Sequence, residues 1–228
     1  MKKLFVFLWV VLLVTSVQAK SLKDLWVSMP DSLLPTLDRN LRLELVELEE
    51  MGVKPNVKNL LGEECDMDTL TNDYLEFTTS KAARLQMIYL PSSAGDSVLC
   101  VIKTFRAPSK ESEIRFYDQG WLQLPISSYL AKDQYALGCY IKPKSDTMRV
   151  EEYEELKSKL EPVMYVTEYL PTAQAFRIQV SLPLLSNEDK MKVCFLYKAL
   201  SFQVTIIKKT AKGGFATSGC GFGMYEVW

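Results

Sequence analysis

The residues best suited to chemistry are four carboxylates that lie close together in the sequence, Glu63, Glu64, Asp66 and Asp68. If this stretch forms a strand, Asp66 and Asp68 project from the same face, because side chains alternate along a strand. Two such carboxylates could hydrolyse a glycosidic bond or hold a hard cation. The spacing is not that of a calcium-binding loop, and acidic runs usually mark a solvated edge. We therefore interpret the cluster as a solvated edge and expect no metal, with glycan hydrolysis as the alternative.

The chain contains no histidine. This excludes Ser-His-Asp and Cys-His catalysis, histidine acid/base chemistry near neutral pH and the common zinc sites with imidazole ligands. Only carboxylate, hydroxyl, lysine and thiol chemistry is left. We therefore favour a protein without catalytic activity and expect no cofactor.

Three further sets of residues invite a functional interpretation. The acidic run Glu151, Glu152, Glu154 and Glu155 is typical of the solvated face of a helix. The basic patch of Lys208, Lys209 and Lys212 is too small to indicate a nucleic-acid surface on a chain with a net charge of −1. The tryptophans that could anchor a partner or a sugar are Trp26, Trp121 and Trp228. Trp26 and Trp121 could equally close the ends of a core.

Five cysteines are spread over the chain without paired spacing. Cys100 and Cys194 occupy matching places in two apolar runs, which favours buried free thiols, with a disulfide as the alternative. The glycine-rich segment 208–228 lacks the Gly-Lys-Ser/Thr of a phosphate-binding loop and is interpreted as a tail.

The first 19 residues have the pattern of a signal peptide. Lys2 and Lys3 precede the apolar run Leu4 to Val14, and small residues suited to cleavage end at Ala19. The run is shorter than the roughly 20 residues that cross a bilayer, so a retained anchor is the less favoured interpretation. We expect an exported protein with no membrane span after cleavage.

Helical spacing of leucines up to Leu48, followed by Gly52, predicts a helix over residues 37–51. Apolar runs bounded by turn residues then predict strands over 65–71, 74–79, 84–90, 97–105 and 113–117, the last continuing at 121–124. Because the connections are short, we expect an antiparallel meander.

The second half predicts a similar order. A helix over 149–161 precedes strands over 164–170, 176–182, 193–197 and 202–206. Residues 86–103 and 179–198 also share one pattern, an apolar run stopped by Leu-Pro, a polar connector ending in Asp96 or Asp189, and a second run with a cysteine. Each copy predicts a hairpin.

These patterns predict an α+β fold of two tandem similar units, each a helix followed by a four- to five-stranded antiparallel meander. The units span residues 20–124 and 149–207, with a linker at 125–148.

The segment Val27 to Pro35, the charged helix after it and the segment Leu70 to Leu75 together resemble an exported family of unknown function from Bacteroidales. The resemblance covers about residues 20–207. It implies export from a Gram-negative cell, to the periplasm or outside, and a two-part architecture. It supplies no catalytic or binding residues.

We predict a non-catalytic interaction module that binds a protein, peptide or glycan through sheet edges or an exposed face, and that binds no nucleic acid. One alternative is a carboxylate-dependent glycan hydrolase. The other is a periplasmic carrier that encloses an apolar ligand.

Overall fold

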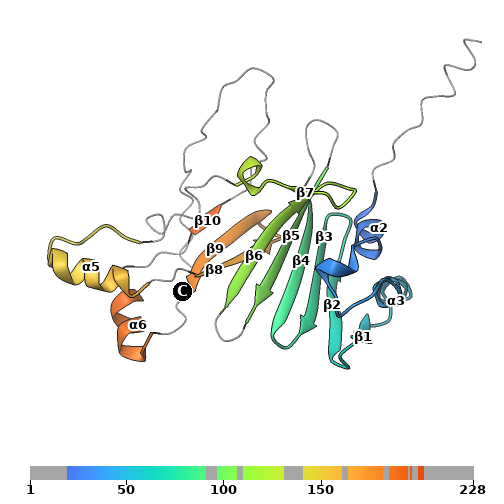
Figure 1. The fold of residues 1–228 in the computed structure, drawn as a ribbon, viewed down its shortest axis with the longest axis horizontal. Coiled ribbons are helices and arrows are strands. Elements are labelled where there is room, and N and C mark those ends of the chain that lie inside the picture. Colours follow the sequence, from blue (N-terminus) through green and yellow to red (C-terminus); the bar gives the residue numbers. More distant parts are fainter. Residues whose placement is uncertain are drawn as a thin grey trace, which may run out of the picture.

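The structure is a computed structural model that describes residues 20–90, 97–106, 110–130, 141–160, 164–181, 185–194, 196 and 200–202. It is an α+β fold with a seven-stranded antiparallel sheet and a three-stranded antiparallel sheet (Figure 1). The predicted signal peptide, the glycine-rich tail with its lysines, and Trp228 lie outside the described residues.

The large sheet is a meander in which each strand pairs with the next along the chain, from β1 to β7. Its strands are β1 Asn56–Lys58, β2 Glu64–Leu70, β3 Tyr74–Ser80, β4 Ala83–Leu90, β5 Val98–Phe105, β6 Glu111–Tyr117 and β7 Gln123–Leu124. This confirms the five predicted strands and adds β1. Its three residues are too few to show the alternation of apolar and polar side chains that marks a strand.

Two helices cover one face of this sheet. They are α2 Leu22–Val27 and α3 Arg39–Glu50, joined through the 3-10 turn η1 Asp31–Leu33. Asp38 caps α3 by accepting hydrogen bonds from the amides of Asn40 and Leu41, both at 2.9 Å. The apolar faces of the helices pack with one side of strands β1 to β6 into a buried core. The predicted helix at 37–51 is confirmed.

The small sheet covers part of the opposite face. Its order is β10-β9-β8, with β8 Met164–Leu170, β9 Ala175–Ser181 and β10 Leu200–Phe202. Phe176 of β9 is buried with Ile88, Cys100 and Phe116 of the large sheet in a second core. Helices α2 and α3 and strands β8 to β10 thus lie on opposite sides of the large sheet (Figure 1).

Two short helices accompany the small sheet, α5 Val150–Ser158 and α6 Asn187–Cys194, and the 3-10 turn η2 Ile126–Ser128 follows β7. Leu156 and Leu160 pack with Val193 and Leu196 in a third, small cluster. Helix α5 confirms the predicted helix at 149–161. No helix among the described residues combines the length and the apolar character needed to cross a membrane.

The structure does not confirm two tandem similar units. The predicted strand at 193–197 is wrong, because Val193 and Cys194 belong to helix α6, so the predicted hairpin over 179–198 does not form. Ser186 explains the helix, since its hydroxyl accepts from the amide of Asp189 at 3.1 Å and donates to its carboxylate at 2.9 Å. Cys100 is a buried free thiol in β5, and Cys194 is at the end of a helix.

Candidate functional site

The four carboxylates near the start of β2 do not converge. The carboxylate of Asp66 lies 2.7 Å from the ammonium of Lys54 and accepts from the amide of Asn56 at 3.0 Å, contacts that lower its pKa. Asp68 accepts from the hydroxyl of Thr78 at 2.7 Å. Glu64 lies 3.8 Å from Lys58. These carboxylates therefore pair separately with neighbouring side chains, on a strand that lies between β1 and β3. The described residues contain no group of three or more potential metal ligands.

Both described tryptophans close ends of the first core. Trp26 is buried, donates to the backbone carbonyl of Arg42 at 3.0 Å and packs 5.1 Å from the ring of Phe77. Trp121 packs 5.4 Å from the ring of Tyr117. Trp26 is therefore enclosed in the core, whereas Trp121 is only partly covered. The acidic run on α5 is exposed, as predicted.

A hollow of about 280 Å³ opens where the segment after η1, the turn between β1 and β2, and the ends of β3, β4 and β5 meet. We call it the Lys103 hollow. Its apolar lining consists of Leu33, Leu34, Pro35, Leu61, Ala83, Leu85 and Phe105. The other lining residues are Thr36, Asn59, Glu63, Thr79, Ser80, Arg84 and Lys103.

A turn fixed by hydrogen bonds between a side chain and the backbone forms part of the rim of the Lys103 hollow. The buried side-chain oxygen of Asn59 accepts from the amides of Leu61 and Glu63 at 2.9 and 3.0 Å. Gly62 completes this turn with a φ of +81°, a conformation that favours glycine. Leu61 in this turn is 73% exposed, and Phe105, which also lines the hollow, is 46% exposed. Two apolar side chains are therefore presented to solvent at the rim.

Two cations line the hollow, and one of them, Arg84, is paired with Glu76 and Glu168, which leaves Lys103. Its half-buried ammonium donates to the backbone carbonyl of Leu33. Burial lowers the pKa of Lys103, an effect that Glu113 on the neighbouring strand opposes and Arg115 reinforces. Lys103 takes part in none of the ion pairs found among the described residues. Sequence analysis missed it, although a lysine inside the apolar run Val98–Phe105 is itself a signal.

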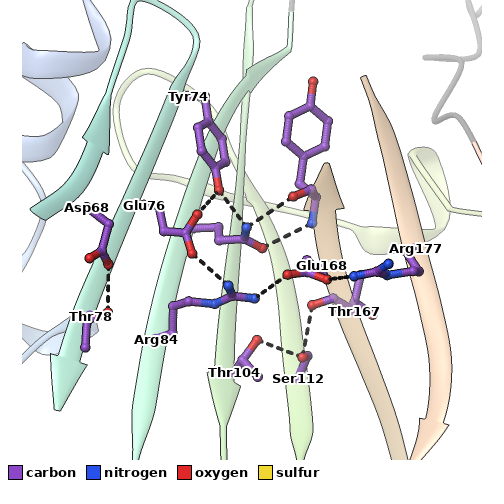
Figure 2. Close-up of polar contacts among 12 residues, drawn as sticks. Asp68, Tyr74, Glu76, Thr78, Arg84, Thr104, Ser112, Thr167, Glu168 and Arg177 are labelled. Atoms are coloured by element: carbon purple, nitrogen blue, oxygen red, sulfur yellow. Dashed lines mark hydrogen bonds and ion pairs between the residues drawn. The ribbon is translucent and has the colours of Figure 1, made fainter. Parts of the chain in front are cut away.

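A second group of polar residues joins the two sheets, and we call it the sheet junction (Figure 2). Arg84 of β4 donates to Glu76 of β3 at 2.7 Å and to Glu168 of β8 at 3.0 Å. Glu168 also accepts from Arg177 of β9. Burial disfavours the charged form of Glu168, but the hydrogen bonds from Arg177 and Arg84 outweigh it and lower the pKa. The junction is therefore a chain of alternating charges.

Gln86 forms the neutral part of the sheet junction. Its amide nitrogen donates to the Tyr74 hydroxyl at 2.7 Å and to the backbone carbonyl of Tyr169 at 3.2 Å, while its oxygen accepts from the Tyr169 amide at 3.1 Å. Beside it, Ser112 donates to the Thr167 carbonyl at 3.1 Å. The Tyr74 hydroxyl in turn donates to Glu76 at 2.5 Å. The pKa of Tyr74 is raised mainly by burial and, to a smaller extent, by this carboxylate.

The sheet junction positions the small sheet rather than a ligand. Arg84 and Glu168 bind groups of the protein itself, and Gln86 uses both ends of its amide on protein partners. By contrast, the Lys103 hollow combines open apolar surface with a cation that has no ionic partner among the described residues. The hollow is therefore the better candidate for binding a ligand.

Comparison with known proteins gives a family and a fold. A family model described as "Protein of unknown function (DUF3256)" matches residues 14–205. A solved structure described as a domain of an uncharacterized protein from Porphyromonas gingivalis W83 is similar with a TM-score of 0.66 at 20% identity, over 81% of this chain and 92% of that chain. No curated protein matches.

Proposed function

The chain belongs to the family described as protein of unknown function (DUF3256), and we propose that it is a non-catalytic module that binds an apolar ligand in the Lys103 hollow. Because the family description names no function, the proposal rests on the geometry of this site. We further propose that the N-terminal segment exports it to the periplasm or the outside of a Gram-negative cell. The proposal combines two predictions from the sequence, the non-catalytic binding module and the carrier of an apolar ligand.

One observation carries the proposal, namely the apolar surface that the hollow leaves open. Leu61 and Phe105 line the hollow and are 73% and 46% exposed, while Leu34 and Leu85 in the same lining are buried. Each exposed apolar side chain would gain about 1–2 kcal/mol when a ligand covers it. The hollow is thus suited to a ligand with a hydrophobic body.

The alternatives have less support. Glycoside hydrolysis needs two carboxyl groups about 5–9.5 Å apart across the bond. Of the four carboxylates at the start of β2, only Glu63 lines the hollow. Binding of a peptide along a sheet edge also has little support, because the edge strands β1 and β7 of the large sheet have three and two residues. The longer edge strand β8 of the small sheet already bonds to Gln86 and Ser112 of the large sheet.

The test is a fluorescence titration with an uncharged hydrophobic dye such as Nile red. We expect Phe105→Ala to weaken dye binding roughly tenfold, because the ring contributes about 1–2 kcal/mol of apolar contact. Leu122→Ala is the matched control, since Leu122 is equally apolar, 67% exposed and not part of the lining. Equal dye affinity in wild type and Phe105→Ala would refute binding in the hollow.

A further inference from the structure

We propose that the ligand of the Lys103 hollow is an aliphatic carboxylic acid whose carboxylate is bound by Lys103. This rests on the proposed binding role and adds the chemical class of the ligand. Its basis is a half-buried ammonium group in a largely apolar hollow, where the described part of the chain supplies a carbonyl partner but no carboxylate partner.

The first step concerns the hydrogen-bonding capacity of Lys103. An ammonium group has three N–H donors. Among the described residues one hydrogen bond is seen, to the carbonyl of Leu33, which leaves two donors for a ligand. A charge withdrawn from water without an ionic partner is costly, and the depressed pKa of Lys103 reflects this burial. A bound carboxylate would offset that cost.

The second step concerns the carboxylates that could pair with Lys103 instead. Glu113 lies opposite Lys103 in the β5–β6 register, but its carboxylate accepts hydrogen bonds from Arg115, one of them at 2.7 Å. Glu63 lines the hollow, but its residue is exposed to solvent at the rim. Neither forms an ion pair with Lys103, so the ammonium is available to an anion.

The third step distinguishes an aliphatic acid from an extended peptide. A bound peptide needs backbone partners, which usually come from an open strand edge. At the floor of the hollow β4 pairs on both sides, since Leu85 lies between Phe77 of β3 and Lys103 of β5. The ladder groups there are already used. An aliphatic chain needs no such partners, and about 280 Å³ is at the small end of ligand pockets, roughly 300–1,000 Å³.

The experiment compares decanoate with 1-decanol, two probes with the same chain and different head groups, by displacement of the dye below micellar concentrations. We expect wild type to bind decanoate roughly tenfold tighter than decanol, as a charge-assisted hydrogen bond implies. Lys103→Met keeps an aliphatic side chain, and it should abolish this preference because it removes the charge that binds the carboxylate. Lys81→Met removes an exposed lysine of the neighbouring β3–β4 turn and should preserve it.

The outcomes separate the two proposals. If wild type binds decanoate and decanol equally, and Lys103→Met changes neither, the acid assignment fails while binding of apolar ligands stands. If neither probe nor dye binds, the binding role itself fails. A third arm uses a leucine-rich tripeptide with a free or an amidated C-terminus. Lys103-dependent binding of the free form, without binding of decanoate, would identify a peptide terminus and overturn the inference.

Discussion

At the scale of single residues, two half-buried charged side chains differ in whether they have an ionic partner. Glu168 has two arginine partners, which lower its pKa against the effect of burial. Lys103 has a carbonyl partner and no ion pair among the described residues, and burial lowers its pKa. The paired carboxylate of Glu168 joins the two sheets, whereas the ammonium of Lys103 has no such ionic partner among the described residues. This contrast supports a structural role for Glu168 and the binding role that we propose for Lys103.

The role of Glu168 predicts a pH-dependent stability. Its folded-state pKa lies below the usual 4.5, so its contribution is fully present above about pH 4.5 and is lost as the pH falls through the lower folded value. We expect Glu168→Gln to lower the free energy of unfolding by about 1–2 kcal/mol at pH 7, a modest value because Arg177 is partly exposed and screened. The difference should shrink as the pH falls below about 4.

Urea unfolding of both proteins over this pH range measures the effect. Glu152→Gln, at an exposed position on α5, is the control and should change stability by less than about 0.5 kcal/mol at every pH. A difference between wild type and Glu168→Gln that stays constant down to pH 3 would contradict an ionic role.

At the scale of elements, β8 is an edge strand that meets the face of another sheet. Three of its backbone groups bond to side chains of the large sheet, because Gln86 binds both the amide and the carbonyl of Tyr169, and Ser112 binds the carbonyl of Thr167. The amide of Gln86 thereby takes the place of a peptide group in a neighbouring strand. This both covers the edge of β8 and fixes where the small sheet docks.

Replacing Gln86 by leucine tests this docking. Gln86→Leu leaves the amide and carbonyl of Tyr169 without their partner, and we expect a loss of about 1–3 kcal/mol in the free energy of unfolding. Hydrogen exchange of the Tyr169 amide should accelerate in parallel. Gln123→Leu makes the same chemical change at an exposed position of β7 and should be nearly neutral. Unchanged exchange at Tyr169 would rule out the proposed role of Gln86.

At the scale of the whole molecule, residues from both predicted units share one core. Phe176 of β9 lies with Ile88, Cys100 and Phe116 of the large sheet. Its ring is 5.1 Å from that of Tyr169, which is 5.7 Å from that of Tyr74. Helices α2 and α3 pack on the other face of the same strands. The two sheets should therefore unfold together.

A substitution that creates a cavity in the shared core tests whether the two sheets unfold together. Phe176→Ala should cost about 3–5 kcal/mol. With Trp9, Trp121 and Trp228 replaced by phenylalanine, the fluorescence of Trp26 reports on the helical side of the large sheet. We expect its transition to shift together with that of the circular dichroism signal. If the Trp26 transition stays at the position of the parent protein while part of the dichroism signal melts earlier, the two parts are independent units.

The sequence by itself determined the local elements and the meander. Apolar runs bounded by turn residues mark strands β2 to β6, and their short connections leave antiparallel pairing of neighbours as the simplest arrangement. Helical spacing of leucines that ends at Gly52 marks α3. These are properties of a few adjacent residues. The strand predicted at 193–197 failed because apolar residues suggested a strand, although the local Ser186–Asp189 capping pattern favoured the helix.

Only the tertiary structure decided which polar groups meet. Lys103 lies 70 residues from its carbonyl partner Leu33, and Gln86 lies 83 residues from Tyr169. No local spacing encodes such pairs, because the partner of a polar side chain depends on which distant segment covers that part of the sheet. The same packing left the Lys103 hollow open and dispersed the carboxylates of β2, so the candidate site follows from how the layers assemble.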